Sequence, residues 1–308
     1  MAPPEAIELA DLVIKAQGLY RDRALYNREV GALYPGLTSW QNSPTAAVLQ
    51  YTPAQLDKLR PGAPCMLGAA HTIRRRSRKV HRIPLQKRLV YATLDRLLGQ
   101  AYRLGSRSFR SSYEVHALGS LTHIRRLELV RRLKQLGVSG DFSLTIPKNR
   151  WVFGIDYYPH TLTSLDSLTE ARIQALQSEL DSLGVKSLRF NRLEYLVRML
   201  QHQLVAAPSG YGELSFRIAE AWAMAKAVLV EDLSHVEIQF PIADRRNALY
   251  IKPDYSNLEQ LIQELRSGAI DALALGQQAH TDWVAYCQKI PQELHRLYVA
   301  PIQQLVIG

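Results

Sequence analysis

The chain has 308 residues, of which 47% are apolar and 8% aromatic, an ordinary globular composition that leaves room for two domains. The first thirty residues hold no apolar core behind a basic start, and the best membrane-span candidate, residues 218–230, is interrupted by Glu220 and Lys226. We therefore expect neither a secretory signal nor a membrane span. The two cysteines, Cys65 and Cys287, stand far apart in the sequence, so they support neither a disulfide framework nor a zinc site. This cysteine usage fits a reducing, cytoplasmic compartment.

The net charge of +10 is concentrated in one part of the chain. Residues 74–134 contain 17 lysines and arginines against three acids, a local excess of +14, so the remainder carries −4. A block of this kind indicates an anionic partner, which can be phosphate, anionic lipid or nucleic acid.

The first hundred residues have a mixed pattern. Residues 10–15 are typical of a short buried strand, and a tyrosine-rich stretch follows. Thr52 followed by Pro53 predicts the start of a helix, and leucines at helical spacing predict another over residues 85–104.

Two helices are predicted in the middle of the chain. Residues 113–118 read as a strand that enters Gly119 and Ser120. Apolar residues at every third position from 121 to 136 then predict a helix that Gly137 ends. A second helix is predicted over 170–183, with Thr169 as its N-cap.

The last third alternates between predicted strands and helices, which favours an α/β fold with parallel βαβ units. Ligands of such sheets bind at the carboxyl ends of the strands. The predicted strands cover 203–207, 227–230 and 247–251, and the predicted helices cover 213–225, 258–265 and parts of 279–306.

A first candidate anion site follows the strand at 113–118. A glycine turn with small hydroxyl residues leads into a helix whose first turn carries arginines, and free N–H groups at a helix start bind anions. A helix cap followed by a solvated basic face is the alternative interpretation. The candidate residues are Gly119, Ser120, Thr122 and Arg126.

A second candidate site begins after the strand at 203–207. Its glycines let a loop pass close to a ligand, Glu213 and Glu220 are spaced to share a helix face, and a carboxylate can bind two ribose hydroxyls. The alternative is a capped surface helix with Glu220 in an ordinary ion pair. The candidate residues are Ser209, Gly210, Tyr211, Gly212, Glu213, Ser215, Arg217 and Glu220.

This second segment resembles the nucleotide-sugar-binding end of GT-B glycosyltransferases, especially the exostosin and protein O-glucosyltransferase groups. The likeness rests on Ser215, Arg217, Glu220 with Ala221, the apolar strand 228–230, Asp232, and Phe240 with Pro241 in reversed order. The 119–126 segment similarly resembles a diphosphate loop of that family. The resemblance implies that Arg126 and Arg217 hold the donor diphosphate and Glu220 the ribose. Ala225 stands where these families usually have glycine.

By that resemblance the chain is a GT-B-like α/β protein with a Rossmann-type domain. We predict a short acceptor-side domain at 1–112, a nucleotide-sugar-binding domain at 113–275, and C-terminal helices at 276–308 that return to the first domain. The donor would be a UDP- or GDP-linked sugar, used without a cofactor. The acceptor would be a glycan, a lipid-linked molecule or a protein.

The sequence contains no Asp-x-Asp motif, which is the usual metal-diphosphate handle of the GT-A class, so we predict metal-independent chemistry. Asp22 and Glu29 are the candidate general bases, and surface carboxylates are the alternative interpretation for both. His71, His81 and His123 are expected to be surface histidines.

The basic run Arg74, Arg75, Arg76, Arg78 and Lys79 favours contact with an anionic membrane surface, and a solvated loop is the alternative. Nucleic acid is a rival partner, although the sequence has no zinc finger or aromatic RNA-binding motif. The second functional hypothesis is a non-catalytic protein that binds nucleotide or polyanion on the same fold.

Overall fold

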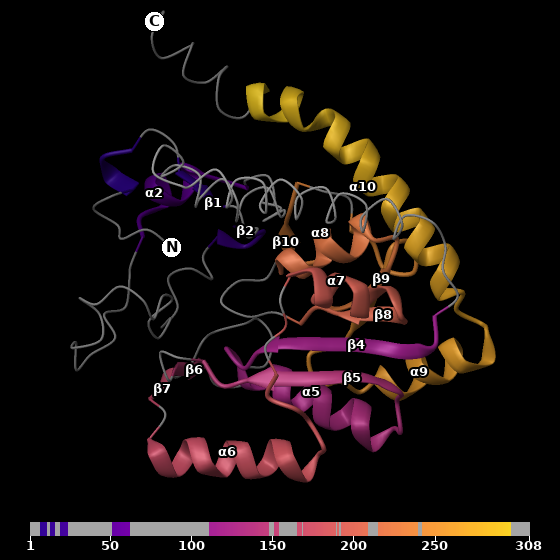
Figure 1. Cartoon of the computed structure of the whole chain (residues 1–308). Helices are drawn as coiled ribbons and strands as arrows, with labels where there is room; N and C mark the ends of the chain where they lie inside the picture. Colours follow the sequence, from indigo (N-terminus) through magenta and orange to yellow (C-terminus); the bar gives the residue numbers. More distant parts are fainter. Residues whose placement is uncertain are drawn as a thin grey trace, which may run out of the picture.

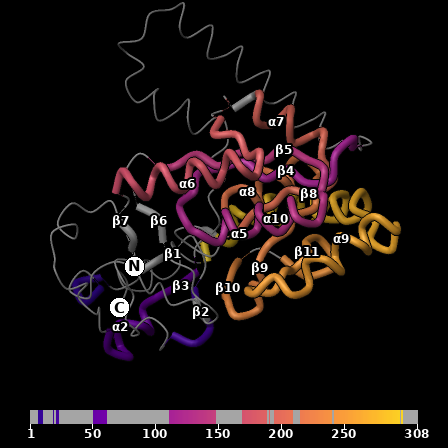
Figure 2. The backbone as a smooth tube through the Cα atoms, turned by 90° about the horizontal axis from the view of Figure 1, so that it is seen from below, coloured from indigo at the N-terminus to yellow at the C-terminus, as the bar shows by residue number. Residues whose placement is uncertain are grey.

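The computed structural model describes residues 7–10, 13–15, 19–23, 51–61, 111–147, 151–153, 165–167, 169–188, 190, 192–208, 215–239 and 242–296. Within them lies a five-stranded sheet whose strands all run parallel, in the order β11-β9-β8-β4-β5 (Figure 1, with β11 labelled in Figure 2). The predicted α/β fold with a Rossmann-type parallel sheet is therefore confirmed. The strands are β4 (Tyr113–Ser120), β5 (Gly140–Thr145), β8 (His202–Ala206), β9 (Ala227–Glu231) and β11 (Ala248–Ile251).

Helices cover both faces of this sheet, which explains why its inner strands are apolar at consecutive positions. In β9, Leu229 packs into one core with α5, α6 and α9, whereas Val228 and Val230 pack into the opposite core with α7, α8 and α10. The helices are α5 (Ile124–Gln135), α6 (Glu170–Ser182), α7 (Arg192–Leu200), α8 (Phe216–Ala223), α9 (Leu258–Ser267) and α10 (Ala272–Leu294).

The direction of strand addition changes at β4. The chain passes from β4 to β5 on one side and then returns to the other side to add β8, β9 and β11. Registered pairs between β4 and β5 continue to Ser120 and Thr145, but those between β4 and β8 end at His116 and Val205. The carboxyl ends of β4 and β8 therefore separate, and such a switch point is where open α/β sheets bind ligands.

Short N-terminal elements attach beside this sheet. Figure 2 shows α2, β2 and β3 gathered near β10, and the contact includes an ion pair between Arg23 and Glu237. Another antiparallel pair, β6 with β7, lies outside the main sheet. These elements are β1 (Val13–Lys15), β2 (Leu19–Tyr20), α2 (Pro53–Asp57), β3 (Leu59–Pro61), β6 (Trp151–Phe153), β7 (Leu165–Ser167) and β10 (Val236–Glu237).

Several predicted element boundaries are correct because local capping sets them. Thr52 forms a capping box with Gln55, and the Thr169 hydroxyl accepts a hydrogen bond from the Arg172 N–H.

Ala225, which stands where the resembled families usually have glycine, adopts a left-handed φ of 52°. Glycine is the usual residue in this backbone conformation.

Three predictions about the elements were wrong or incomplete. The helix expected over 121–136 begins at Ile124, because His123 is its N-cap. The helix expected from Glu213 begins at Phe216, because Ser215 is its N-cap, and Glu213 itself lies outside the described residues. The sequence patterns did not identify β5 or α7.

Other predictions from the sequence are untested. The helix over 85–104 lies outside the described residues, and the division at 1–112, 113–275 and 276–308 stays a prediction. In the part of the chain that the structure describes, no helix combines the length and the apolar character that a membrane crossing requires.

Candidate functional site

A pocket of about 850 Å³ opens where β4 and β8 separate. Its walls come from the carboxyl ends of β4 and β5, the residues that follow β5, the α7 region and the first turn of α8. Seven residues predicted from two distant sequence segments line this one pocket. They are Gly119, Ser120, Thr122, Arg126, Ser215, Arg217 and Glu220.

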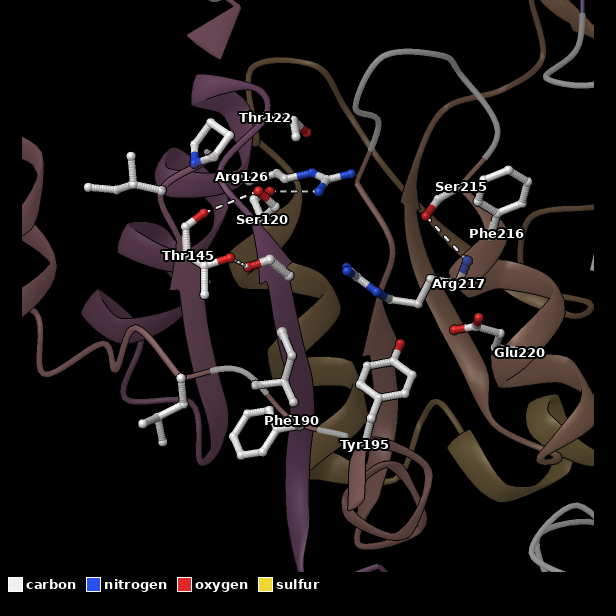
Figure 3. Close-up of a pocket in the computed structure, with 15 residues that line it drawn as sticks. Ser120, Thr122, Arg126, Thr145, Phe190, Tyr195, Ser215, Phe216, Arg217 and Glu220 are labelled. Carbon is white, nitrogen blue, oxygen red and sulfur yellow. Dashed lines mark hydrogen bonds between the residues drawn. The ribbon is translucent and has the colours of Figure 1, made fainter. Parts of the chain in front are cut away.

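The guanidinium groups of Arg126 and Arg217 both lie close to Gly119. A Cβ atom at this position would lie 2.5 Å from Arg217 Nη2 and 3.6 Å from Arg126 Nη1. Figure 3 shows the two guanidinium groups extending into the pocket from its opposite walls. The absence of a side chain at Gly119 therefore gives Arg217 room to approach the carboxyl end of β4.

Backbone carbonyl groups hold both guanidinium groups in place. Arg217 Nη1 donates to Ala206 O at 2.9 Å, at the end of β8 where that strand no longer pairs with β4. Arg126 Nη1 donates to Ser120 O at 2.7 Å. No carboxylate of the described residues lies within ion-pair distance of Arg217, so its positive charge has no ion-pair partner in this part of the protein.

Hydroxyl groups form the wall on the β4–β5 side. Ser120 Oγ donates to Thr145 O at 3.2 Å, and the Thr145 hydroxyl donates to Gly119 O at 3.4 Å. Thr122 Oγ1 is buried and has no hydrogen-bond partner among the described residues. Because an unsatisfied buried hydroxyl costs about 1–3 kcal/mol, Thr122 is a group that a polar ligand could satisfy.

The opposite wall combines one carboxylate with aromatic side chains. Glu220 lies one turn after Arg217 on α8 and is only 7% exposed. Phe216, at the start of the same helix, is 39% exposed at the pocket, and Phe190 and Tyr195 also line it. In Figure 3 the Tyr195 hydroxyl points toward the side where Arg217 lies. The sequence analysis did not identify Phe190, Tyr195 or Thr145 as site residues.

Buried histidines lie beneath this wall. The ring of His116 contacts Tyr195, with 5.2 Å between ring centroids, and also contacts His202. Burial, together with the charges of His202, Arg217 and Arg198, holds the pKa of His116 well below its usual range. The His116 ring is therefore neutral at neutral pH.

His116, His202 and Asp141 lie close enough to share a metal ion, with their ligand atoms within 4.8 Å of one another. However, both ring nitrogens of His202 are already engaged, with Arg198 O at 2.7 Å and with the Asp141 N–H at 3.1 Å. Arg198 also pairs with the Asp141 carboxylate at 3.1 Å. We therefore assign no metal to this cluster.

Two expectations for the region around α5 need correction. His123 was expected on the surface, but it is 5% exposed, and its Nδ1 accepts the Arg125 N–H at 3.1 Å. That amide is therefore not free for an anion at the start of α5, and the positive groups of the pocket are the guanidinium side chains of Arg126 and Arg217.

The other predicted residues are not among the described residues that line the pocket. Asp22 is exposed near β2 and does not line the pocket, so its role as a general base stays a prediction. Several others lie outside the described residues. These are Glu29, Arg74, Arg75, Arg76, Arg78, Lys79, Ser209, Gly210, Tyr211, Gly212 and Glu213.

Comparison with known proteins finds a likeness to a solved structure. No family model and no curated protein matches the chain. The chain is similar to the crystal structure of a glycosyltransferase from Rickettsia africae ESF-5, with 14% sequence identity and a TM-score of 0.39. The similarity covers 79% of this chain and 58% of that glycosyltransferase, so the chain matches little more than half of its length.

Proposed function

We propose that this protein is a glycosyltransferase whose nucleotide-sugar donor binds in the pocket at the β4–β8 separation. The observation that carries the proposal is the convergence of Arg126 and Arg217 on Gly119. At an effective dielectric constant of about 20, two unit charges roughly 4–8 Å apart repel by about 2–4 kcal/mol. A bound diphosphate would offset that repulsion and accept charge-assisted hydrogen bonds from both guanidinium groups.

The other walls supply contacts for the rest of a nucleotide sugar. Glu220 would accept hydrogen bonds from the ribose hydroxyls, and its position one helical turn from Arg217, which would hold the diphosphate, supports that role. The exposed ring of Phe216 offers a flat apolar surface for a base. Thr122 provides a hydroxyl that a phosphate oxygen would satisfy.

The proposed chemistry uses the arginines as electrostatic catalysts. Transfer breaks the bond between the anomeric carbon and the diphosphate oxygen, so negative charge develops on the departing nucleoside diphosphate. Arg126 and Arg217 would stabilise that charge in place, without a metal ion. The acceptor hydroxyl loses a proton, and the base that takes it is proposed to come from the 1–112 segment, where Asp22 and Glu29 are the candidates.

A non-catalytic nucleotide-binding protein is the second candidate function. The number of carboxylates in the pocket favours it, because Glu220 is the only one among the described residues that line the pocket. A group assigned to the ribose cannot also serve as the base. Binding and turnover must therefore be measured separately.

The test is calorimetric titration of the full chain with UDP, GDP, ADP and CMP, comparing wild type with Arg217→Ala, Glu220→Ala and Arg172→Ala. Arg172 is an exposed arginine on α6 outside the pocket and serves as the matched control. We expect one nucleoside diphosphate to bind, both pocket variants to weaken it, and the control to leave it unchanged. Equal affinity in wild type and Arg217→Ala would overturn the assignment of the pocket.

Turnover is then measured with the UDP- or GDP-sugar of the nucleotide that binds, by release of the nucleoside diphosphate with and without candidate acceptors. Release that Arg217→Ala abolishes supports the transferase. Tight binding without release under any condition supports the non-catalytic alternative.

A further inference from the structure

A second pocket, of about 340 Å³, lies at the opposite end of the strands from the first. Ser111 precedes β4, Gln203 stands near the start of β8 and Lys226 precedes β9, so the pocket opens at the amino ends of the strands. The first turn of α10 closes its other side. This position is separate from the carboxyl-end pocket, and nothing in the proposed transfer reaction uses it.

Lys226 is the unusual residue in this pocket. It is only 5% exposed, and the one hydrogen bond that its ammonium group makes among the described residues is donated to Ser111 Oγ at 2.9 Å. The Ser111 hydroxyl in turn donates to His202 O at 2.8 Å, so it accepts from the lysine. No carboxylate of the described residues lies within ion-pair distance of Lys226, which leaves two ammonium N–H groups for a ligand.

Burial of an ammonium group without a counter-charge is costly, and the protein reduces that cost in part by deprotonation. Burial lowers the pKa of Lys226 to about 8. An anion in the pocket would remove the cost in another way, by pairing with the protonated amine.

The start of α10 adds favourable polarity and one opposing charge. The Ala272 N–H, at the first helical position, has no intrahelical acceptor, because the helix begins there. The Asp271 carboxylate caps the helix through Oδ1, which accepts from the Leu273 and Ala274 N–H groups at 2.9 and 3.0 Å. Its negative charge weakens anion binding at the pocket rim, so its removal should strengthen that binding.

We propose that this pocket is a second ligand site, which binds the phosphate or carboxylate group of a small molecule between the Lys226 ammonium group, Ser111 and the first turn of α10. The proposal does not depend on the donor pocket or on glycosyl transfer.

The experiment measures how fast acetic anhydride acylates each lysine of the full-length protein at neutral pH, by mass spectrometry, with and without inorganic phosphate or acetate. Lys186 and Lys252 are exposed and serve as internal controls, and chloride is the ionic-strength control. If phosphate fills nine-tenths of the sites, acylation of Lys226 should slow about tenfold, because only unoccupied protein reacts. Slowing by phosphate alone identifies a phosphate group as the ligand, and slowing by acetate alone identifies a carboxylate.

Two variants sharpen the result. Asp271→Ser keeps a helix-capping hydroxyl but removes the negative charge, so protection of Lys226 should need less anion. Arg217→Ala empties the other pocket of its guanidinium group and should leave the protection unchanged. The proposal is overturned if neither anion slows Lys226, if all three lysines slow equally, or if protection is lost in Arg217→Ala.

Discussion

Gly119→Ala tests whether Arg217 holds the donor diphosphate, because one added methyl group reaches that side chain. The new Cβ would lie 2.5 Å from Arg217 Nη2, closer than a Cβ contact can be, and the far end of a flexible side chain is the part that must move. The guanidinium group would leave its position beside Ala206 O. Loss of one charge-assisted hydrogen bond costs about 1.5–3 kcal/mol. The Kd of the nucleoside diphosphate should therefore rise roughly 10- to 150-fold.

The free energy of unfolding should fall moderately in the same variant, by about 0.5–2.5 kcal/mol. The lost charge-assisted bond to Ala206 O costs about 1.5–3 kcal/mol, and the preference of a strand for alanine over glycine offsets about 0.5–1 kcal/mol of that cost. Urea unfolding checks this balance, while calorimetric titration with the nucleoside diphosphate that wild type binds gives the affinity.

A double-mutant cycle isolates the cause. In an Arg217→Ala background the methyl group meets no guanidinium group, so Gly119→Ala should have almost no further effect on Kd. The reasoning is refuted if Gly119→Ala weakens binding equally in both backgrounds, or if it leaves the affinity of the wild-type background unchanged.

Three further predictions follow from the structure. Glu220→Gln should raise the Kd of the nucleoside diphosphate at least several-fold while leaving inorganic pyrophosphate unaffected, because the carboxylate is assigned to the ribose; equal losses in a paired titration would contradict that assignment. Leu229→Ala should lower the free energy of unfolding in urea by about 2–5 kcal/mol, because Leu229 is fully buried in β9, whereas Val284→Ala, at a position 41% exposed, should cost far less. Lys226 has a folded pKa lowered from 10.5 to about 8, so the unfolded chain binds more protons between these values and stability should rise with pH across that window, by up to about 3 kcal/mol. In Lys226→Met this contribution should be absent, and identical pH profiles of wild type and variant in urea unfolding would argue against it.

The sequence predicted the elements whose signals are local. The continuous apolar run 228–230 is buried on both faces, and Thr169 acts as the helix cap that its position indicates. β5 also carries a local signal, because its residues alternate between polar and apolar from Asp141 to Thr145 as in a half-buried strand, yet it was not predicted. Its sequence does not show that its polar residues have partners that are distant in the chain. Asp141 pairs with Arg198, and the Ser143 hydroxyl donates to Leu188 O at 3.1 Å. Tertiary contacts of this kind leave no periodic trace in the sequence.

The candidate site was predictable only in part, for the same reason. The glycine and arginines of the 119–126 segment and the serine, arginine and glutamate of the 215–220 segment each stand in a recognisable local pattern. These two segments line one pocket because the chain, after β5, returns to the other side of β4 and adds β8 there. Tyr195 and Phe190 could not be assigned, because their place in the pocket depends on the packing of the α7 region against the sheet.

The order of the strands also has a consequence for how the protein assembles. β4 and β5 pair within one short stretch of chain, and β8, β9 and β11 pair within another, so each half of the sheet can form from neighbouring contacts. The two halves meet along a single seam between β4 and β8, and we expect closure of the long intervening segment to be the slow step of folding, because it costs the most chain entropy. The carboxyl-end pocket lies across that seam and exists only after it closes. A ligand bound there would contact both halves of the sheet and stabilise their association. It should therefore protect the amides of β4 and β8 from hydrogen exchange more than those of β11.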